Sequence, residues 1–188
     1  ASETGEHADL LWGLRGGGGN FGVVTRFTYR LHPVGPEVYF ASVFHDGEGA
    51  ATERVLRFYR DFSERAPESV NSLAACGVIP AHPELFPAAI HGRRFVLIGA
   101  LFVGTVAEGE QVLRPIRDFA TPLTDFSGPT PYLEVQTFFD EDYPDGQRYY
   151  WKSLNLSRFD DEVIDRIAAH EGAVHAFVVQ ALAGEPIR

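Results

Sequence analysis

Five glycines fall within seven residues in the stretch Leu14-Arg15-Gly16-Gly17-Gly18-Gly19-Asn20-Phe21-Gly22-Val23-Val24-Thr25. Residues 7–14, at its start, have apolar side chains at helical spacing, and residues 23–31, at its end, alternate as a strand does. Glycine lacks a Cβ and tolerates positive φ, so this run suits a tight connection. The same properties let peptide N–H groups line the phosphates of a ligand.

Gly17, Gly19 and Gly22 match the G-x-G-x-x-G pattern of dinucleotide-binding folds. That pattern requires a strand before the glycines and a helix after them. Here the helical pattern comes first and the strand pattern second, which argues against a Rossmann site. No Lys-Ser or Lys-Thr follows the glycines, so a P-loop is excluded as well. A glycine-rich surface turn without a ligand is the alternative interpretation.

Residues 9–25, together with His32-Pro33-Val34, resemble a segment of the FAD-linked oxidases of the berberine-bridge-enzyme type. This family belongs to the vanillyl-alcohol-oxidase-like flavoprotein superfamily. Residues 131–136 and 146–153 also resemble phrases of its bacterial members. In the family, the glycine phrase closes the FAD-binding domain and its backbone lies along the FAD. The resemblance therefore implies cofactor contacts by Gly17, Gly18, Gly19, Asn20, Phe21, Gly22, Val23, Val24 and Thr25.

The resemblance also implies that the chain is a C-terminal fragment of a longer enzyme. The chain contains no methionine, and the family has an FAD-binding portion ahead of this point and a further stretch after it. We expect residues 1–36 to be the C-terminal end of the FAD-binding domain. Residues 37–188 are then the substrate-binding lobe, incomplete at its C-terminus. Two prolines and a glycine within residues 32–36 favour a boundary there.

The composition excludes several classes of function. The 188 residues are 45% hydrophobic and 22% charged, which is typical of a soluble globular protein, and no apolar run is long enough to span a bilayer. A net charge of −10 disfavours nucleic acid as a partner. Cys76 is the single cysteine, so it predicts neither an internal disulfide nor a zinc site, and His170 and His175, five residues apart, give only a weak metal signal. We expect a cytoplasmic protein, with secretion left open because the N-terminus is missing.

Periodicity beyond residue 36 predicts an α+β fold. Its antiparallel sheet is expected to be covered by helices on one side. Predicted strands cover 37–45, 69–79, 94–103, 132–139 and 175–182, predicted helices cover 49–65, 107–119 and 160–169, and a short element covers 148–156.

The predicted strand over 132–139 provides candidate substrate residues. Tyr132, Glu134 and Gln136 would share its polar face. By resemblance to sugar-oxidising relatives, Gln136 could position a substrate hydroxyl or carbonyl over the isoalloxazine. The alternative is that these are solvated sheet residues.

Other polar and aromatic residues give no firm site. Tyr149, Tyr150 and Trp151 could bind a substrate ring, but we expect core packing for Trp151 and at least one tyrosine. His175 is expected to be a half-buried strand residue. The catalytic residues are unknown, because the resemblance puts the base and the flavin attachment residues in parts of the enzyme outside this chain.

The resemblance implies hydride transfer from a small organic substrate, an alcohol, sugar or secondary metabolite, to FAD in the intact parent. The fragment alone is expected to hold no tightly bound FAD and to be inactive. A non-catalytic α+β interaction or dimerisation module is the alternative function. In that case exposed sheet edges would pair two copies into a homodimer.

Overall fold

The computed structural model describes residues 5–150, 152–170 and 177–181. The chain separates into two compact units, Ala1–Pro33 and Val34–Arg188, and each is described by itself. This division falls within residues 32–36. The assignment of the two units to an FAD-binding domain and a substrate lobe stays a prediction.

In its described residues, 5–33, the first unit contains one helix and one 3-10 turn. The predicted helix is confirmed as α1 (Ala8–Leu14), and η1 (Gly18–Phe21) follows it. The strand predicted over residues 23–31 is wrong, because these residues have no regular secondary structure. A strand needs a neighbour to pair its N–H and C=O groups, and alternation alone does not provide one. Val23 and Leu31 are accordingly 92% and 87% exposed.

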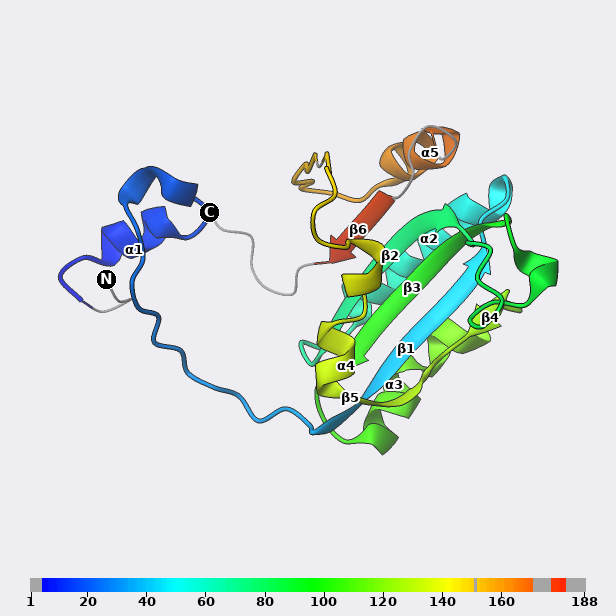
Figure 1. The fold of residues 1–188 in the computed structure, drawn as a ribbon, viewed down its shortest axis with the longest axis horizontal. Coiled ribbons are helices and arrows are strands. Elements are labelled where there is room, and N and C mark those ends of the chain that lie inside the picture. The colour runs from blue at the N-terminus through cyan, green and yellow to red at the C-terminus, as the bar shows by residue number, and fades with distance from the viewer. Residues whose placement is uncertain (1–4, 151, 171–176, 182–188) are drawn as a thin grey trace. The chain divides into compact units, whose positions relative to one another are not determined.

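The second unit is built on a six-stranded sheet with the order β4-β1-β3-β2-β6, in which β5 also pairs with β1 (Figure 1). Every pairing is antiparallel. The strands are β1 (Glu37–Asp46), β2 (Val70–Val78), β3 (Arg94–Phe102), β4 (Thr124–Asp125), β5 (Gly128–Pro131) and β6 (Phe177–Ala181). The strands predicted over 37–45, 69–79 and 94–103 are confirmed. The last predicted strand is confirmed over β6, whereas His175 and Leu182 lie outside the described residues.

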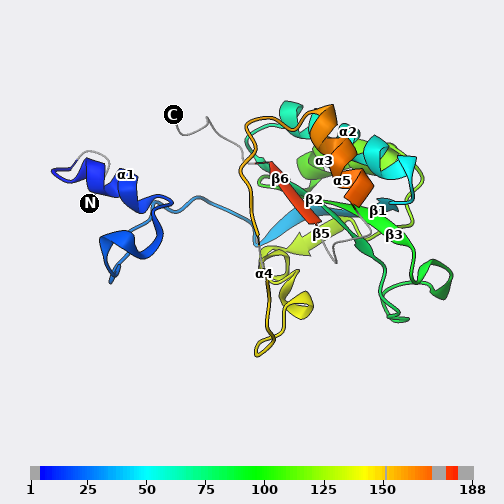
Figure 2. The same ribbon diagram turned by 90° about the horizontal axis from the view of Figure 1, so that it is seen from above.

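Helices α2 (Ala50–Arg65), α3 (Val106–Asp118) and α5 (Asp161–His170) lie on one side of this sheet (Figure 2). All three were predicted, and the α+β class is confirmed. Thr105 and Glu108 form a reciprocal capping box at the start of α3. The core between helices and sheet includes Val55, Leu56, Tyr59, Val96, Ile98, Leu113, Ile116 and Ile164.

Alternation along β1 divides its side chains between two environments. Tyr39, Ala41 and Val43 face the helices, so Phe40 and Phe44 lie on the opposite side. We call this opposite side the open face. It comprises Phe40, Ser42 and Phe44 of β1, Asn71, Leu73 and Ala75 of β2, and Leu97, Gly99 and Leu101 of β3, which the register places opposite one another. One end of the open face is covered by the loop between β2 and β3, through Ile79, Phe86 and Ile90.

The strand predicted over residues 132–139 is wrong. Residues Tyr132–Gln136 form the short helix α4, followed by a turn and by η3 (Asp140–Asp142). The apolar residues at 132, 135 and 139 fit helical spacing, and these three are the partly buried ones. The N–H of Tyr132 donates to the carbonyl of Pro36 at 2.9 Å, which holds the start of the helix directly after β5.

No regular element forms in the described residues between 148 and 156. Tyr149 and Tyr150 are 44% and 83% exposed, so core packing of a tyrosine here is wrong. Tyr149 instead donates its hydroxyl to the carbonyl of Pro144 at 2.7 Å, and Lys152 lies 5.7 Å from the centre of the Tyr150 ring. Trp151 lies outside the described residues.

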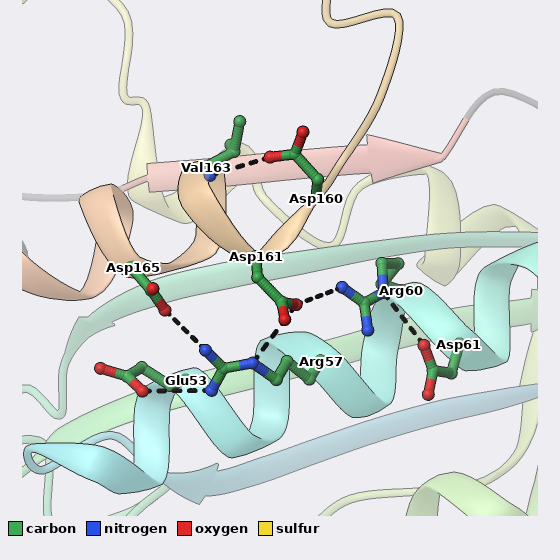
Figure 3. Close-up of polar contacts among 8 residues, drawn as sticks. All are labelled: Glu53, Arg57, Arg60, Asp61, Asp160, Asp161, Val163 and Asp165. Atoms are coloured by element: carbon green, nitrogen blue, oxygen red, sulfur yellow. Dashed lines mark hydrogen bonds and ion pairs between the residues drawn. The ribbon is translucent and has the colours of Figure 1, made fainter.

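Ion pairs attach α5 to α2 (Figure 3). Arg57 donates to Asp165 at 2.6 Å and to Asp161 at 3.4 Å, and Arg60 donates to Asp161 at 2.6 Å. The hydrogen bond from Arg60, with the charges of both arginines, lowers the pKa of Asp161 below its usual value. Beneath these exposed pairs the side chain of Ile164 is fully buried, so apolar packing supplies the firmer attachment.

Candidate functional site

The glycine loop of the first unit needs most of its glycines for its own conformation. Gly16, Gly18 and Gly22 have φ values of 95°, 61° and 119°, a region that residues with a side chain rarely adopt. A β-carbon at Gly17 would collide with the carbonyl of Gly13 and with the Phe21 ring. These four positions therefore require glycine whether or not a ligand is present.

Gly19 differs from the other glycines of this loop. Its φ is not positive, and no atom lies within 4 Å of the place where its β-carbon would be. The side-chain amide of the neighbouring Asn20 donates to the carbonyl of Gly17 at 2.7 Å. This hydrogen bond closes the turn that contains Gly19. The conformation of the loop therefore does not explain why residue 19 is glycine, whereas the close approach of a ligand would. FAD contact by residues 17–25 stays a prediction.

Helix α4 holds the three predicted substrate residues of the second unit. Residues four apart share one side of a helix, so Tyr132 and Gln136 lie together, while Glu134 points to a different side. Glu134 and Gln136 are exposed, and Tyr132 is half-buried. The three side chains therefore do not share the single face expected of a strand. Their contact with a substrate stays a prediction.

Aromatic rings gather along the β1 side of the open face. The rings of Phe40 and Phe138 meet edge to face at 5.1 Å between centroids, and those of Phe44 and Phe126 meet at 5.8 Å. Phe44 also contacts Phe86 at 5.3 Å. Phe138 comes from the turn after α4, so this segment reaches the open face through an aromatic side chain.

Ser42 lies between Phe40 and Phe44 and was not predicted as a site residue. Its backbone is fully paired, because its N–H donates to the hydroxyl of Ser127 at 3.1 Å and its carbonyl accepts from the N–H of Phe126 at 2.9 Å. The residue is 1% exposed, and its Oγ is buried and has no hydrogen-bond partner among the described residues. The spacing Phe40-x-Ser42-x-Phe44, one serine in an aromatic stripe, was the sequence signal that could have identified it.

His45 was also missed, and it lies on the helix-facing side of β1. The residue is 1% exposed, it packs against the ring of Phe119, and neither ring nitrogen has a hydrogen-bond partner among the described residues. Burial lowers the pKa of His45, and the backbone of Ile116 and the charge of Asp125 oppose this only in part. The ring is therefore neutral in the folded protein at neutral pH.

Asp125 and Arg117 form a polar link between β4 and α3 near this histidine. Arg117 donates to Asp125 at 2.6 Å and to the hydroxyl of Tyr39 at 3.3 Å, and the N–H of Ser127 donates to Asp125 at 2.9 Å. Burial alone would raise the pKa of Asp125, but the hydrogen bonds from Ser127 and Arg117 outweigh it and lower the pKa. These groups are satisfied by one another, which indicates a structural role.

Neither a metal centre nor a membrane span is found in the part of the chain that the structure describes. No group of three His, Cys, Asp or Glu side chains there could hold a metal ion. No helix there is both long enough and apolar enough to cross a membrane.

Comparison with known proteins shows to which class of protein this chain is similar. Over 142 residues the chain is 28% identical to an FAD-linked oxidoreductase of Dictyostelium discoideum, a match that covers 76% of this chain and 28% of that protein. It is 31% identical over 146 residues to the FAD-linked oxidoreductase azaG of Aspergillus niger, covering 73% of this chain and 27% of the relative. This chain is a homologue of FAD-linked oxidoreductases.

A bacterial FAD-linked oxidoreductase, YgaK of Bacillus subtilis, is similar as well, at 27% identity over 135 residues, which are 71% of this chain and 27% of that protein. No protein-family profile matches the chain. The chain spans about a quarter of the length of these relatives. The link to FAD-linked oxidoreductases that the glycine stretch indicated is thereby supported, while the berberine-bridge type and the fragment status stay predictions.

Proposed function

We propose that this FAD-linked oxidoreductase homologue is part of an enzyme of the berberine-bridge type that passes a hydride from a small organic substrate to FAD. The observation that carries the proposal is similarity over 76% of the chain to a protein named an FAD-linked oxidoreductase. The matched regions cover only 28% and 27% of these relatives, so the reaction belongs to the whole protein.

The glycine loop fits a bound FAD. Open space at Gly19 lets a ligand come close to the backbone, and the glycines with positive φ hold the loop in one form around it. Residues 17–25 would bind the cofactor through their backbone and through Asn20. When bound, FAD supplies the hydride acceptor, and the chain supplies contacts and orientation.

The second unit would provide one wall of the substrate site. Tyr132 and Gln136 share a side of α4, so they could orient a substrate hydroxyl or carbonyl. Glu134 points elsewhere and is left out of this contact. We assign no catalytic base to this chain.

The test compares the chain with a protein of the relatives' full length that contains it. The longer protein should be yellow, with one flavin per chain, and an oxidisable alcohol or phenol should bleach it under anaerobic conditions. The 188-residue chain should be colourless and inactive, since one loop offers too little contact area to retain FAD. The proposal would be overturned if the longer protein is purified without flavin and does not retain FAD that is added to it.

A non-catalytic interaction module is the second candidate, and the edge position of β6 favours it. Among the described strands, β6 pairs only with β2, which leaves its other edge available to a second copy. Sedimentation equilibrium distinguishes the two functions. A flavin-free dimer of the longer protein would support the module, and a flavin-containing protein that turns over would support the oxidoreductase.

A further inference from the structure

The segment that joins α3 to α4 lies at one edge of the sheet and is held there by few bonds. We call residues 119–131 the edge arm. It includes β4 and β5, which pair only with β1 among the described strands (Figure 1). Strand β4 is only two residues long. Beside it, the N–H of Leu123 donates to the carbonyl of Phe44 at 2.7 Å, and the N–H of Phe126 donates to β1 at 2.9 Å. The edge arm is therefore a part of the sheet that can open without disturbing β2 and β3.

His45 of β1 lies beneath the first residue of this arm. Its ring meets that of Phe119 edge to face at 5.8 Å, and Phe119 stacks on Phe58 of α2 at 4.2 Å. Val96 of β3 lies opposite His45. Phe119, Phe58 and Val96 are apolar, so none of them can share a proton. His45 is 1% exposed, and a protonated ring would have two N–H donors with no acceptor among the described residues.

The charged groups near His45 are already paired with one another. Asp125 of β4 is the carboxylate whose charge acts on this ring. It accepts from Arg117 of α3 at 2.6 Å and from the N–H of Ser127 at 2.9 Å, and Arg117 also donates to the hydroxyl of Tyr39 at 3.3 Å. Asp125 could therefore neutralise a proton on His45 only by weakening the link between β4 and α3.

Opening of the edge arm relieves the burial of His45. Burial lowers the pKa of His45 from 6.5, and the backbone of Ile116 and the charge of Asp125 oppose this only in part. Arg114 and Asp118, in the last turn of α3, pair with each other at 3.5 Å and are largely exposed. Once the arm is open, water reaches the ring and its pKa returns towards 6.5. The open form then binds a proton that the closed form does not, so a fall in pH below 6.5 favours opening.

We propose that His45 is a pH-sensitive switch whose protonation releases residues 119–131 from β1 while β1, β2, β3 and their helices stay folded. The arm continues directly into α4, where the N–H of Tyr132 donates to the carbonyl of Pro36 at 2.9 Å. Its release loosens the helix that holds Tyr132 and Gln136. The effect on substrate binding rests on the proposed function, but the opening itself does not.

Hydrogen exchange of backbone amides, followed by NMR on the 188-residue chain, measures this opening. Leu123 and Phe126 report on the edge arm, and Ile98 of β3, between β1 and β2, is the reference. At pH 7.5 the opening constants of Leu123 and Phe126 should exceed that of Ile98. They should depend little on added urea, because the arm exposes little surface when it opens. Below pH 6.5 they should rise by up to about tenfold per pH unit.

Three variants connect this rise to His45. His45→Leu should abolish the rise at Leu123 and Phe126, and His45→Phe, which keeps a ring against Phe119, should do the same and serves if His45→Leu does not fold. His82→Leu, at an exposed position, should retain the rise. The proposal would be overturned if the rise persists in the His45 variants. It would also be overturned if both arm amides have the same opening constant and urea dependence as Ile98, since the sheet would then open only as a whole.

The flavin content of the longer protein separates this inference from the proposed function, because the exchange experiment needs no flavin. A yellow longer protein, together with an edge arm that does not open in acid, would overturn only the switch. A longer protein that retains no flavin, together with an arm that opens through His45, would overturn only the oxidoreductase.

Discussion

The two sides of strand β1 differ in how completely their side chains are satisfied. On the helix-facing side, Tyr39, Ala41 and Val43 are buried in one continuous core with α2 and α3. On the open face, Phe40 is only partly buried, and Ser42 retains an unpaired hydroxyl. Because successive residues of a strand point to opposite sides, one strand can build a continuous core with one set of residues and leave the other set less completely satisfied.

The largest loss of stability is expected from a substitution in the core on the helix-facing side of β1. Leu56 of α2 is fully buried in that core, so Leu56→Ala should destabilise the protein by about 2–5 kcal/mol through lost burial and a residual cavity. Urea unfolding followed by far-ultraviolet circular dichroism measures this loss. A loss as small as that of an exposed control such as Leu133→Ala would show that the helices do not depend on this core.

A smaller effect is expected from a substitution in α4, which lies on the open side of the sheet. In the longer protein, Gln136→Ala should lower kcat/KM about tenfold if its amide contacts the substrate, because a lost neutral hydrogen bond costs about 1 kcal/mol or slightly more. Stability should stay the same, since Gln136 is exposed. Glu134→Gln, on another side of α4, is the matched control and should leave kcat/KM unchanged. Unchanged kinetics for Gln136→Ala would remove this residue from the substrate site.

The neutral histidine of the helix-facing side should make stability depend on pH. The folded pKa of His45 is below its ordinary value of 6.5, so below about that pH the unfolded chain binds a proton that the folded chain does not. Stability should be complete above pH 6.5 and fall as the pH decreases towards the folded pKa, with a slope of at most about 1.4 kcal/mol per pH unit. Unfolding titrations measure this slope.

His45→Leu should remove the slope in that range, whereas the exposed His82→Leu should retain it. The pKa values of Asp125 and Asp161 are lowered from 3.8, the ordinary value for aspartate. These two groups therefore change stability only below about pH 3.8 and do not affect the slope assigned to His45. Equal slopes in the wild type and His45→Leu would show that the burial of His45 does not control its protonation.

The smallest change in stability is expected from a substitution at Ser42, on the open face of β1. Ser42→Ala removes an unpaired buried hydroxyl, so stability should stay within about 0.5 kcal/mol of the wild type or rise slightly. The measurement is again urea unfolding. A loss above about 2 kcal/mol would mean that the hydroxyl has a structural partner.

The central sheet and its helices were predictable because their sequence patterns are long. Nine or ten residues of apolar and β-branched character specify β1, β2 and β3, and α2 has 16 residues with one apolar stripe. Over the few residues at 132–139, one apolar set alternates (133, 135, 139) and another has helical spacing (132, 135, 139), so the pattern did not distinguish α4 from a strand. Residues 23–31 alternate correctly but have no strand beside them in the described part of the chain.

The site residues were harder to predict than the elements that position them. Ser42 and His45 are ordinary strand residues in the sequence, and only the tertiary neighbours show that their polar atoms are buried without partners. Gly19 could not be distinguished from Gly17 or Gly22 until the structure showed which glycines the loop itself requires.

The most direct test of the central claim is therefore the flavin content of the longer protein carrying Gly19→Val. Because Gly19 has open space around it and no positive φ, a side chain there should leave the loop folded and affect only what approaches it. Gly22→Val is not suitable, since its φ of 119° strains any substitution. The account predicts that Gly19→Val loses most of its flavin at an unchanged apo-protein melting temperature, while Gly128→Ala, also in open space, keeps its flavin. Full flavin occupancy in Gly19→Val would contradict it.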